Sequence, residues 1–225
     1  MTDMRFKPIY LTHQAGVSST HVRTVINGIS QVLGLAGVAN LIAIHNLGMW
    51  RDETWRSSGE LLPHASVDWY IQAGKRQSTR RNQLLSDAIV SEITHDLWQE
   101  SQPHYEVMIL ESDIYCDNCN FIVGQAMKNV LAIVSVNRFL SLDNDLQQEC
   151  IKTVAMHEIG HMFGIPNYGR TDGSLSQSLG NHCANTCIMR QGLIVPEAFI
   201  RITEDRLRNG PFCGTCIGEL REFFQ

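Results

Sequence analysis

The sequence HEIGH at residues 157–161, followed by Gly164, constrains the fold of this chain more than any other segment. On a helix, His157 and His161 lie four residues apart on one face, so both imidazoles can reach one metal ion. Glu158 can face the same ion without binding it, which is where the general base of a zinc site belongs. Gly164 is a residue that commonly ends a helix. The pattern therefore predicts a helix ending beside a zinc site; the alternative is a solvated helix face with two unrelated histidines.

Segments with strand and helix character alternate before this helix, which indicates an α/β fold with a twisted sheet. We expect strands at residues 6–11, 38–45, 106–110, 121–126 and 130–136, a candidate strand at 67–73, and helices at 19–35 and 82–100. The motif helix is expected to begin at Asp143 or Asn144, with Gln147 completing a capping box. Residues 167–181 are rich in Gly, Ser and Asn and indicate a loop, and 195–209 is expected to be the last helix.

Composition excludes several classes of partner. The net charge of −5 disfavours nucleic acid and anionic membranes, because those partners require clustered Lys and Arg. No apolar run is long enough to cross a bilayer, and residues 1–16 lack the apolar core of a signal peptide. We therefore expect a cytoplasmic monomer in which the seven cysteines are reduced.

A catalytic zinc needs a third protein ligand, which must follow Gly164. Asn167 stands at the spacing usual for zincins, but an amide oxygen is a weaker ligand than an imidazole. The next candidate is His182, which Cys183 follows directly. Ligand strength favours His182, and the residues alone leave both candidates open.

Four cysteines near the end of the chain suit a tetrahedral structural zinc. They form one spaced pair and one Cys-x-x-Cys pair: Cys183, Cys187, Cys213 and Cys216. The alternative is a pair of disulfides, which a reducing compartment disfavours.

A further Cys-x-x-Cys, Cys116 and Cys119, lies between two expected strands. It could bind a metal with another ligand or sense the redox state. We prefer the simpler interpretation, a tight turn with incidental thiols.

Together these elements resemble the archaemetzincins, a metzincin-type group of zinc peptidases. The resemblance is carried by the 157–164 motif, the His182-Cys183 pair, Cys187-x-Met189 and the final Phe212-Cys213-x-x-Cys216, with the upstream segments 113–115, 121–126 and 134–138. It covers roughly residues 80–220.

The resemblance implies a metzincin-like fold and a peptidase function. The fold would be a twisted mixed β-sheet with a backing helix and an active-site helix (residues 1–165), followed by a small irregular C-terminal subdomain with a terminal helix (166–225). Two zinc ions per chain and a peptide or protein substrate are implied. The implied roles are catalytic zinc ligands His157, His161 and His182, general base Glu158, structural zinc ligands Cys183, Cys187, Cys213 and Cys216, and Met189 in a Met-turn beneath the catalytic ion.

The chain departs from the family pattern in the ligand loop. Asn167 stands where the third histidine is expected, and the His-Cys pair follows fifteen residues later. Cys183 and Cys187 are separated by three residues instead of four. Residues 167–181 would then be an insertion, which a flexible loop tolerates at little entropic cost. The departure supports a rival function, a non-catalytic zinc-binding module for protein interaction, whereas the retained Glu158 argues against it. A nucleic-acid-binding zinc ribbon is a weaker rival because it lacks a basic surface.

Overall fold

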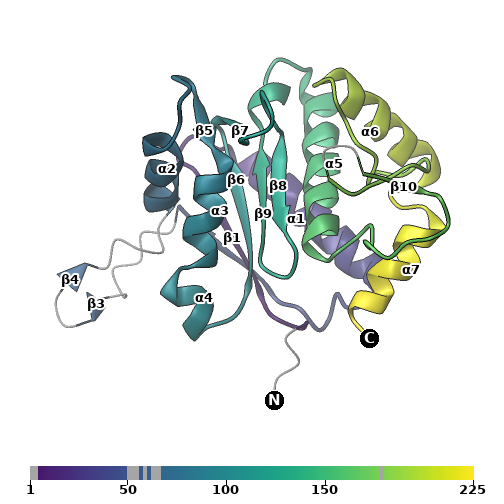
Figure 1. Cartoon of the computed structure of the whole chain (residues 1–225), viewed down its shortest axis with the longest axis horizontal. Helices are drawn as coiled ribbons and strands as arrows, with labels where there is room; N and C mark the ends of the chain where they lie inside the picture. Colours follow the sequence, from purple (N-terminus) through teal and green to yellow (C-terminus); the bar gives the residue numbers. More distant parts are fainter. Residues whose placement is uncertain (1–4, 50–55, 58–59, 62–66, 178–179) are drawn as a thin grey trace.

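A computed structural model of the chain describes residues 5–49, 56–57, 60–61, 67–177 and 180–225. Within these ranges, five strands form one mixed sheet in the order β2-β1-β6-β9-β8 (Figure 1). The strands are β1 (Ile9–His13), β2 (Ile44–Gly48), β6 (Tyr105–Leu110), β8 (Gly124–Met127) and β9 (Leu131–Ser135). β1, β2, β6 and β9 are parallel, whereas β8 is antiparallel to β9 and forms one edge.

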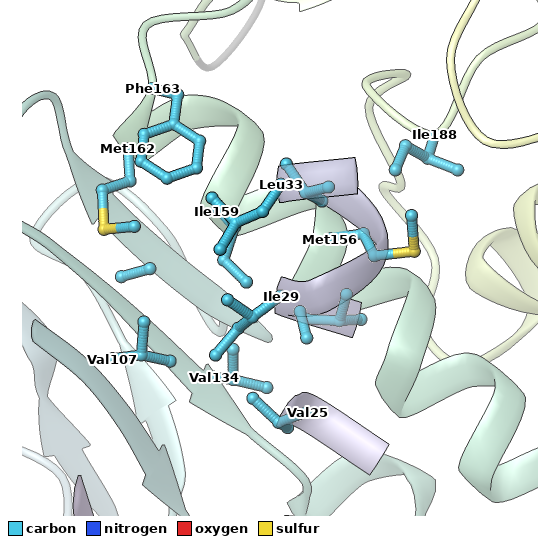
Figure 2. Close-up of a cluster of buried hydrophobic side chains, with 14 of the residues drawn as sticks. Val25, Ile29, Leu33, Val107, Val134, Met156, Ile159, Met162, Phe163 and Ile188 are labelled. Carbon is cyan, nitrogen blue, oxygen red and sulfur yellow. The ribbon is translucent and has the colours of Figure 1, made fainter. Parts of the chain in front are cut away.

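The central strand β6 is buried on both faces, which explains its apolar run at residues 107–110. Successive side chains of a strand point to opposite faces. Val107 and Ile109 accordingly join a core with helices α1 (Ser19–Ala36) and α5 (Asn144–Met162). Figure 2 shows Val107 and Val134 facing residues of both helices. Met108 and Leu110 join a second core on the opposite face.

The first helix forms where the sequence predicts it. The Ser18 side chain accepts a hydrogen bond from the backbone N–H of His21 and caps the N-terminus of α1. Gly37 ends the helix with φ +80°, a conformation that favours glycine. The apolar spacing predicted from the sequence is the buried stripe of α1, with Val25, Ile29 and other members in the core.

The motif helix α5 begins at Asn144 as predicted, but the predicted capping box is wrong. The Gln147 side chain is buried and donates a 3.0 Å hydrogen bond to the carbonyl of Phe139. Its Oε1 lies 3.0 Å from His21 Nε2 on α1. Gln147 therefore joins α5 to α1 and to the 3-10 helix η1 (Asn137–Phe139) instead of capping α5.

Two predictions near the second strand are wrong. Residues 67–73 belong to a helix, α2 (Val67–Arg76), with Val67, Tyr70 and Ala73 buried at helical spacing. The sequence also alternates apolar and more polar residues from Val67 to Ala73, as a half-buried strand would, so periodicity alone did not exclude a strand here. Strand β2 begins only at Ile44; residues 39–42 before it form a turn.

The helix predicted at 82–100 is three elements: β5 (Gln83–Leu85), α3 (Ser86–Thr94) and α4 (Leu97–Ser101). β5 pairs in parallel with β7 (Asp113–Tyr115), which places Leu84 opposite Ile114. The Asp96 side chain then caps α4 by accepting from the backbone N–H of Trp98. Helices α2 and α3 pack together beside the second core (Figure 1).

The C-terminal part packs onto α5 and α1 (Figure 1). The predicted loop at 167–181 contains a short strand, β10 (Leu175–Ser176), that pairs antiparallel with β11 (His182–Cys183). Helix α6 (Glu197–Asn209) follows Pro196 as predicted, but it is not the last, because α7 (Gly214–Phe223) comes after it. Two further strands of two residues each, β3 (Arg56–Ser57) and β4 (Glu60–Leu61), pair antiparallel. In the described part of the chain, no helix combines the length and apolarity needed to cross a membrane.

Candidate functional site

Three histidines converge beside the C-terminal half of α5. His157 and His161 come from α5 and His182 comes from β11, and one ring nitrogen of each lies within 4.8 Å of the other two. The Nε2 atoms of His157 and His161 are 3.1 Å apart. Two nitrogens bound to one tetrahedral zinc at ~2.0 Å would lie about 3.3 Å apart. The spacing of these two imidazoles on α5 therefore fits a zinc ion.

The environment keeps these imidazoles neutral and suitably oriented. His157 Nδ1 donates a 2.6 Å hydrogen bond to the carbonyl of Ile188, which leaves the Nε2 lone pair facing the cluster. Burial, followed by the neighbouring His182, lowers the pKa of His157 to about 3. The pKa of His161 is also well below its usual value, chiefly through burial. A metal requires neutral histidine, so the cluster is prepared to bind one.

Glu158 lies buried against the edge strand. A Cβ atom at Gly124 of β8 would stand 2.6 Å from Glu158 Oε1, so the carboxyl occupies the space that the absent side chain leaves. Burial raises the pKa of this carboxyl to about 8. Glu158 also lines the same cleft as His161 and His182. This position suits a group that exchanges a proton with a molecule in the cleft.

Met189 is fully buried under the motif helix. A Cβ atom at Gly160 would lie 2.5 Å from the Met189 sulfur, so Gly160 permits the close contact between α5 and the C-terminal part. The carbonyl of Met189 accepts a 2.8 Å hydrogen bond from the backbone N–H of Cys183. Met189 thus packs against the helix of His157 and His161 and is bonded to the residue beside His182.

The four C-terminal cysteines form a second cluster. Their sulfur atoms all lie within 4.8 Å of one another: Cys183, Cys187, Cys213 and Cys216. All four are free thiols, and the sulfurs of Cys183 and Cys213 are 3.7 Å apart. A disulfide bond measures about 2.05 Å, whereas two sulfurs at ~2.3 Å from one tetrahedral zinc lie about 3.8 Å apart. The donor set and its spacing therefore fit a zinc ion and not a disulfide.

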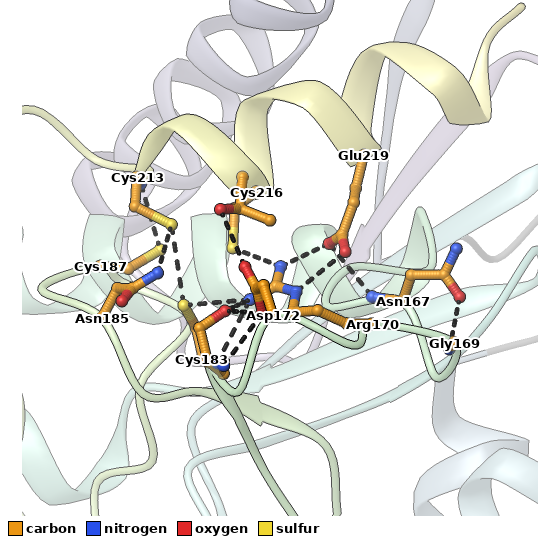
Figure 3. A network of polar contacts seen from close by, with 12 residues as sticks. Asn167, Gly169, Arg170, Asp172, Cys183, Asn185, Cys187, Cys213, Cys216 and Glu219 are labelled. Atoms are coloured by element: carbon orange, nitrogen blue, oxygen red, sulfur yellow. Dashed lines mark hydrogen bonds and ion pairs between the residues drawn. The ribbon is translucent and has the colours of Figure 1, made fainter.

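Arg170 is a residue that the sequence analysis missed. Its guanidinium group is buried and donates hydrogen bonds to Cys183, Cys216 and Glu219 (Figure 3). Hydrogen bonds from the Cys187 and Cys216 thiols, with a smaller contribution from Arg170, lower the pKa of the Cys183 thiol. The sequence indicated this role only weakly: Arg170 is the single basic residue between positions 167 and 181.

A cleft of about 630 Å³ runs past the histidine cluster. Its lining includes residues of the edge strand β8, the residues before that strand, and Leu193, Val195 and Phe199. Glu158, His161 and His182 also line it. The candidate catalytic groups are thus open to a ligand that lies along β8.

Asn167 is held by the loop and by α7. Its side-chain oxygen accepts a 3.0 Å hydrogen bond from the backbone N–H of Gly169, and its own N–H donates to Glu219 at 3.1 Å (Figure 3). The residue is exposed, and His182 is the side chain that joins His157 and His161.

Cys116 and Cys119 lie at the rim of the cleft. The N–H of Cys119 donates to the carbonyl of Cys116 at 3.0 Å, which forms a turn after β7. Burial, together with the Cys119 thiol, raises the pKa of Cys116 to about 12. Among the described residues, this pair joins no third metal-binding side chain.

Comparisons with known proteins agree with this arrangement. A model described as "Peptidase family M54" matches residues 89–222. The chain is 31% identical over 110 residues to a protein named "Archaemetzincin" from Archaeoglobus fulgidus. That match covers 48% of this chain and 55% of the relative, so the chain spans about half the length of this curated relative.

Solved structures show the same fold. The crystal structure of an archaemetzincin from Methanopyrus kandleri is similar with a TM-score of 0.65 and 19% identity, and the match covers 100% of this chain and 99% of that one. A structure described as a zinc-dependent peptidase from Methanocorpusculum labreanum is similar with a TM-score of 0.53 and 19% identity, covering 94% and 99% of the two chains. The predicted metzincin-like α/β fold is thereby confirmed.

Proposed function

Because the chain belongs to peptidase family M54, we propose that it is a zinc-dependent metallopeptidase that hydrolyses peptide bonds. The observation that carries this proposal is the convergence of His157, His161 and His182 in one cleft with Glu158. Family membership also confirms the resemblance to archaemetzincins drawn from the sequence.

His157, His161 and His182 would hold the catalytic zinc. His182 is preferred to Asn167 because its ring nitrogen lies within the cluster, whereas the Asn167 side-chain oxygen already accepts from Gly169. Imidazole is also the stronger ligand. When bound, zinc lowers the pKa of water toward neutrality and polarises the scissile carbonyl.

Glu158 would act as the general base and then as the general acid. A zinc ion bound nearby would lower the pKa of this carboxyl and favour its charged form. The carboxylate would then take the proton of the attacking water, and the resulting carboxylic acid would deliver that proton to the leaving amine. The contact with Gly124 holds the carboxyl on the cleft side of α5. No other carboxyl group lines the cleft among the described residues, so Glu158 is the natural candidate for this role.

The edge strand β8 would bind the peptide substrate. Among the described strands, β8 pairs with β9 alone, so its other side can pair with an extended peptide, as exposed sheet edges do. A peptide in that position would pass along the cleft beside Glu158, which packs against Gly124 of the same strand.

A second zinc would be bound by Cys183, Cys187, Cys213 and Cys216. Its role would be structural, because four thiolates leave no open position for a substrate. Cys183 follows His182 directly, so this site would also hold the third catalytic ligand in place.

Metal analysis with activity assays tests these assignments. Wild type should contain two zinc ions per chain, and Glu158→Ala should lose turnover of a peptide mixture while keeping both. His182→Ala should lose or weaken one zinc, whereas Asn167→Ala, the matched control, should keep both. Equal zinc loss from Asn167→Ala, or none from His182→Ala, would overturn the ligand assignment.

The rival function predicts a different result. If the chain is a non-catalytic zinc module, wild type will bind zinc but show no turnover, and Glu158→Ala will behave as wild type. The edge of β8 and its cleft would then be sites of protein binding only.

A further inference from the structure

Every N–H group of the Arg170 guanidinium donates a hydrogen bond. Nε donates to Glu219 Oε1 at 2.9 Å, and one terminal nitrogen donates to Glu219 Oε2 at 2.5 Å and to the sulfur of Cys216 at 3.2 Å. The other terminal nitrogen donates to Ser174 Oγ at 3.1 Å and to the sulfur of Cys183 at 3.3 Å. Arginine has five N–H donors in a planar fork, and each has an acceptor here. The side chain is 2% exposed, so these bonds form away from water.

Burial of this charge costs desolvation free energy, which its hydrogen-bond partners must offset. Glu219 alone would neutralise the guanidinium, yet two further N–H groups point at sulfur atoms (Figure 3). Those sulfurs belong to the four-cysteine cluster. Four thiolates around one divalent zinc leave a net charge of about −2, which a buried cation stabilises. Arg170 is the cation that contacts Cys183 and Cys216 of this cluster.

Arg170 also connects the cluster to the strand of His182. The arginine donates to Ser174, and the carbonyl of Ser174 accepts a 2.7 Å hydrogen bond from the N–H of Ala184. The next two residues form β10, in which Leu175 pairs with Cys183 and Ser176 pairs with His182. A continuous set of bonds therefore runs from α7 through Arg170 to the residue that completes the histidine cluster.

We propose that Arg170 is a positioning residue that stabilises the zinc-bound form of the four-cysteine site and fixes residues 167–176 on α7. The sequence is expected to depart from the family pattern in this segment, and Arg170 anchors it. The proposal rests on the second zinc of the proposed function. Lysine cannot replace Arg170, because a single ammonium has three donors and no fork to match Glu219 and two sulfurs at once.

Cobalt(II) titration of the full-length chain tests the proposal without an activity assay. Cobalt bound by thiolates gives a sulfur-to-metal charge-transfer absorption, and competition with zinc then gives the affinity of the four-cysteine site. Arg170→Lys and Arg170→Leu should weaken that affinity by about 10–100-fold, the usual effect of removing a hydrogen bond to a metal ligand. Arg208→Lys is the matched control, because Arg208 forms only an exposed pair with Glu204, and it should titrate as wild type.

Glu219→Gln covers the case in which the Arg170 variants fail to fold. It retains all the arginine donors and removes the anchoring charge with one of the two acceptor oxygens, so it should weaken zinc binding less than Arg170→Lys. Wild-type affinity in Glu219→Gln and in every folded Arg170 variant would overturn the proposal, as would lower thermal stability with unchanged affinity. Absence of the thiolate absorption from wild type would overturn both this proposal and the second zinc; its presence with unaffected variants overturns this proposal alone.

Discussion

The two parts of the histidine cluster are held in different ways. His157 and His161 belong to α5, a regular helix of 19 residues whose period alone aligns them. His182 belongs to a strand of two residues, β11, that follows an irregular loop. Local sequence cannot hold such a strand, since two residues form too few bonds. The comparison teaches that the helix positions His157 and His161 by its secondary structure, whereas His182 is positioned by tertiary contacts, among them the pairing of β11 with β10 and, as proposed, the four cysteines and Arg170.

The largest effect is expected from removing a cysteine ligand, which tests the support of the loop. Cys216→Ser should lose one zinc per chain and destabilise the fold by several kcal/mol, because binding of a structural zinc contributes about 10–16 kcal/mol to small zinc domains. Cys150→Ser is the matched control, since Cys150 is buried on α5 away from the cluster. Metal content and thermal melting measure the difference. Equal zinc content in both variants would contradict a structural metal at this site.

The Gly124→Ala substitution tests how α5 positions Glu158 against β8. The added Cβ would lie 2.6 Å from Glu158 Oε1, so the carboxyl must move. A displacement of about 1 Å can reduce turnover 100-fold, so Gly124→Ala should lower kcat by roughly that factor. Zinc content should stay at the wild-type value, because the histidines do not contact Gly124. Unchanged kcat would show that the position of Glu158 does not limit the reaction.

A methyl group at Gly160 tests the contact between the two parts. The Cβ would lie 2.5 Å from the Met189 sulfur, and neither the helix nor the buried Met189 has free space. Overpacking of this kind costs about 1–3 kcal/mol, which chemical denaturation should detect in Gly160→Ala. Gly218→Ala is the control, since a Cβ there meets no atom within 4 Å. Similar stability of the two variants would mean that the contact readily relaxes.

The smallest effect is expected from Gln147→Ala at the far end of α5. It removes hydrogen bonds to Phe139 and His21 and leaves buried polar atoms without partners, at a cost of about 1–2 kcal/mol. Both zinc ions should remain, because the histidines lie at the other end of the helix. Loss of zinc from this variant would show that the helix does not position its ligands independently.

The sequence predicted the parts of the fold that follow a period. The apolar spacing of residues 19–35 predicted α1 closely, and the apolar run at 107–110 predicted most of the central strand β6. It failed where long-range pairing decides: Leu84 and Leu85 suit a helix, yet they pair with β7 as a strand. The histidine and cysteine clusters could be proposed from ligand chemistry. The role of Arg170 could not be predicted, because the two sulfur atoms that accept its hydrogen bonds lie 13 and 46 residues further along the chain.

The adjacency of His182 and Cys183 has a consequence for how this loop can vary. Neighbouring residues in a strand point to opposite faces, so one dipeptide contributes a ligand to each of two clusters. Residues gained or lost between Gly164 and Arg170 leave the pairing of β10 with β11 unchanged. One residue inserted between His182 and Cys183 would turn one of the two side chains to the wrong face. If both clusters bind metal as proposed, the two metal centres share a fixed spacing: the length of the chain before Arg170 can vary, but the step from His182 to Cys183 cannot.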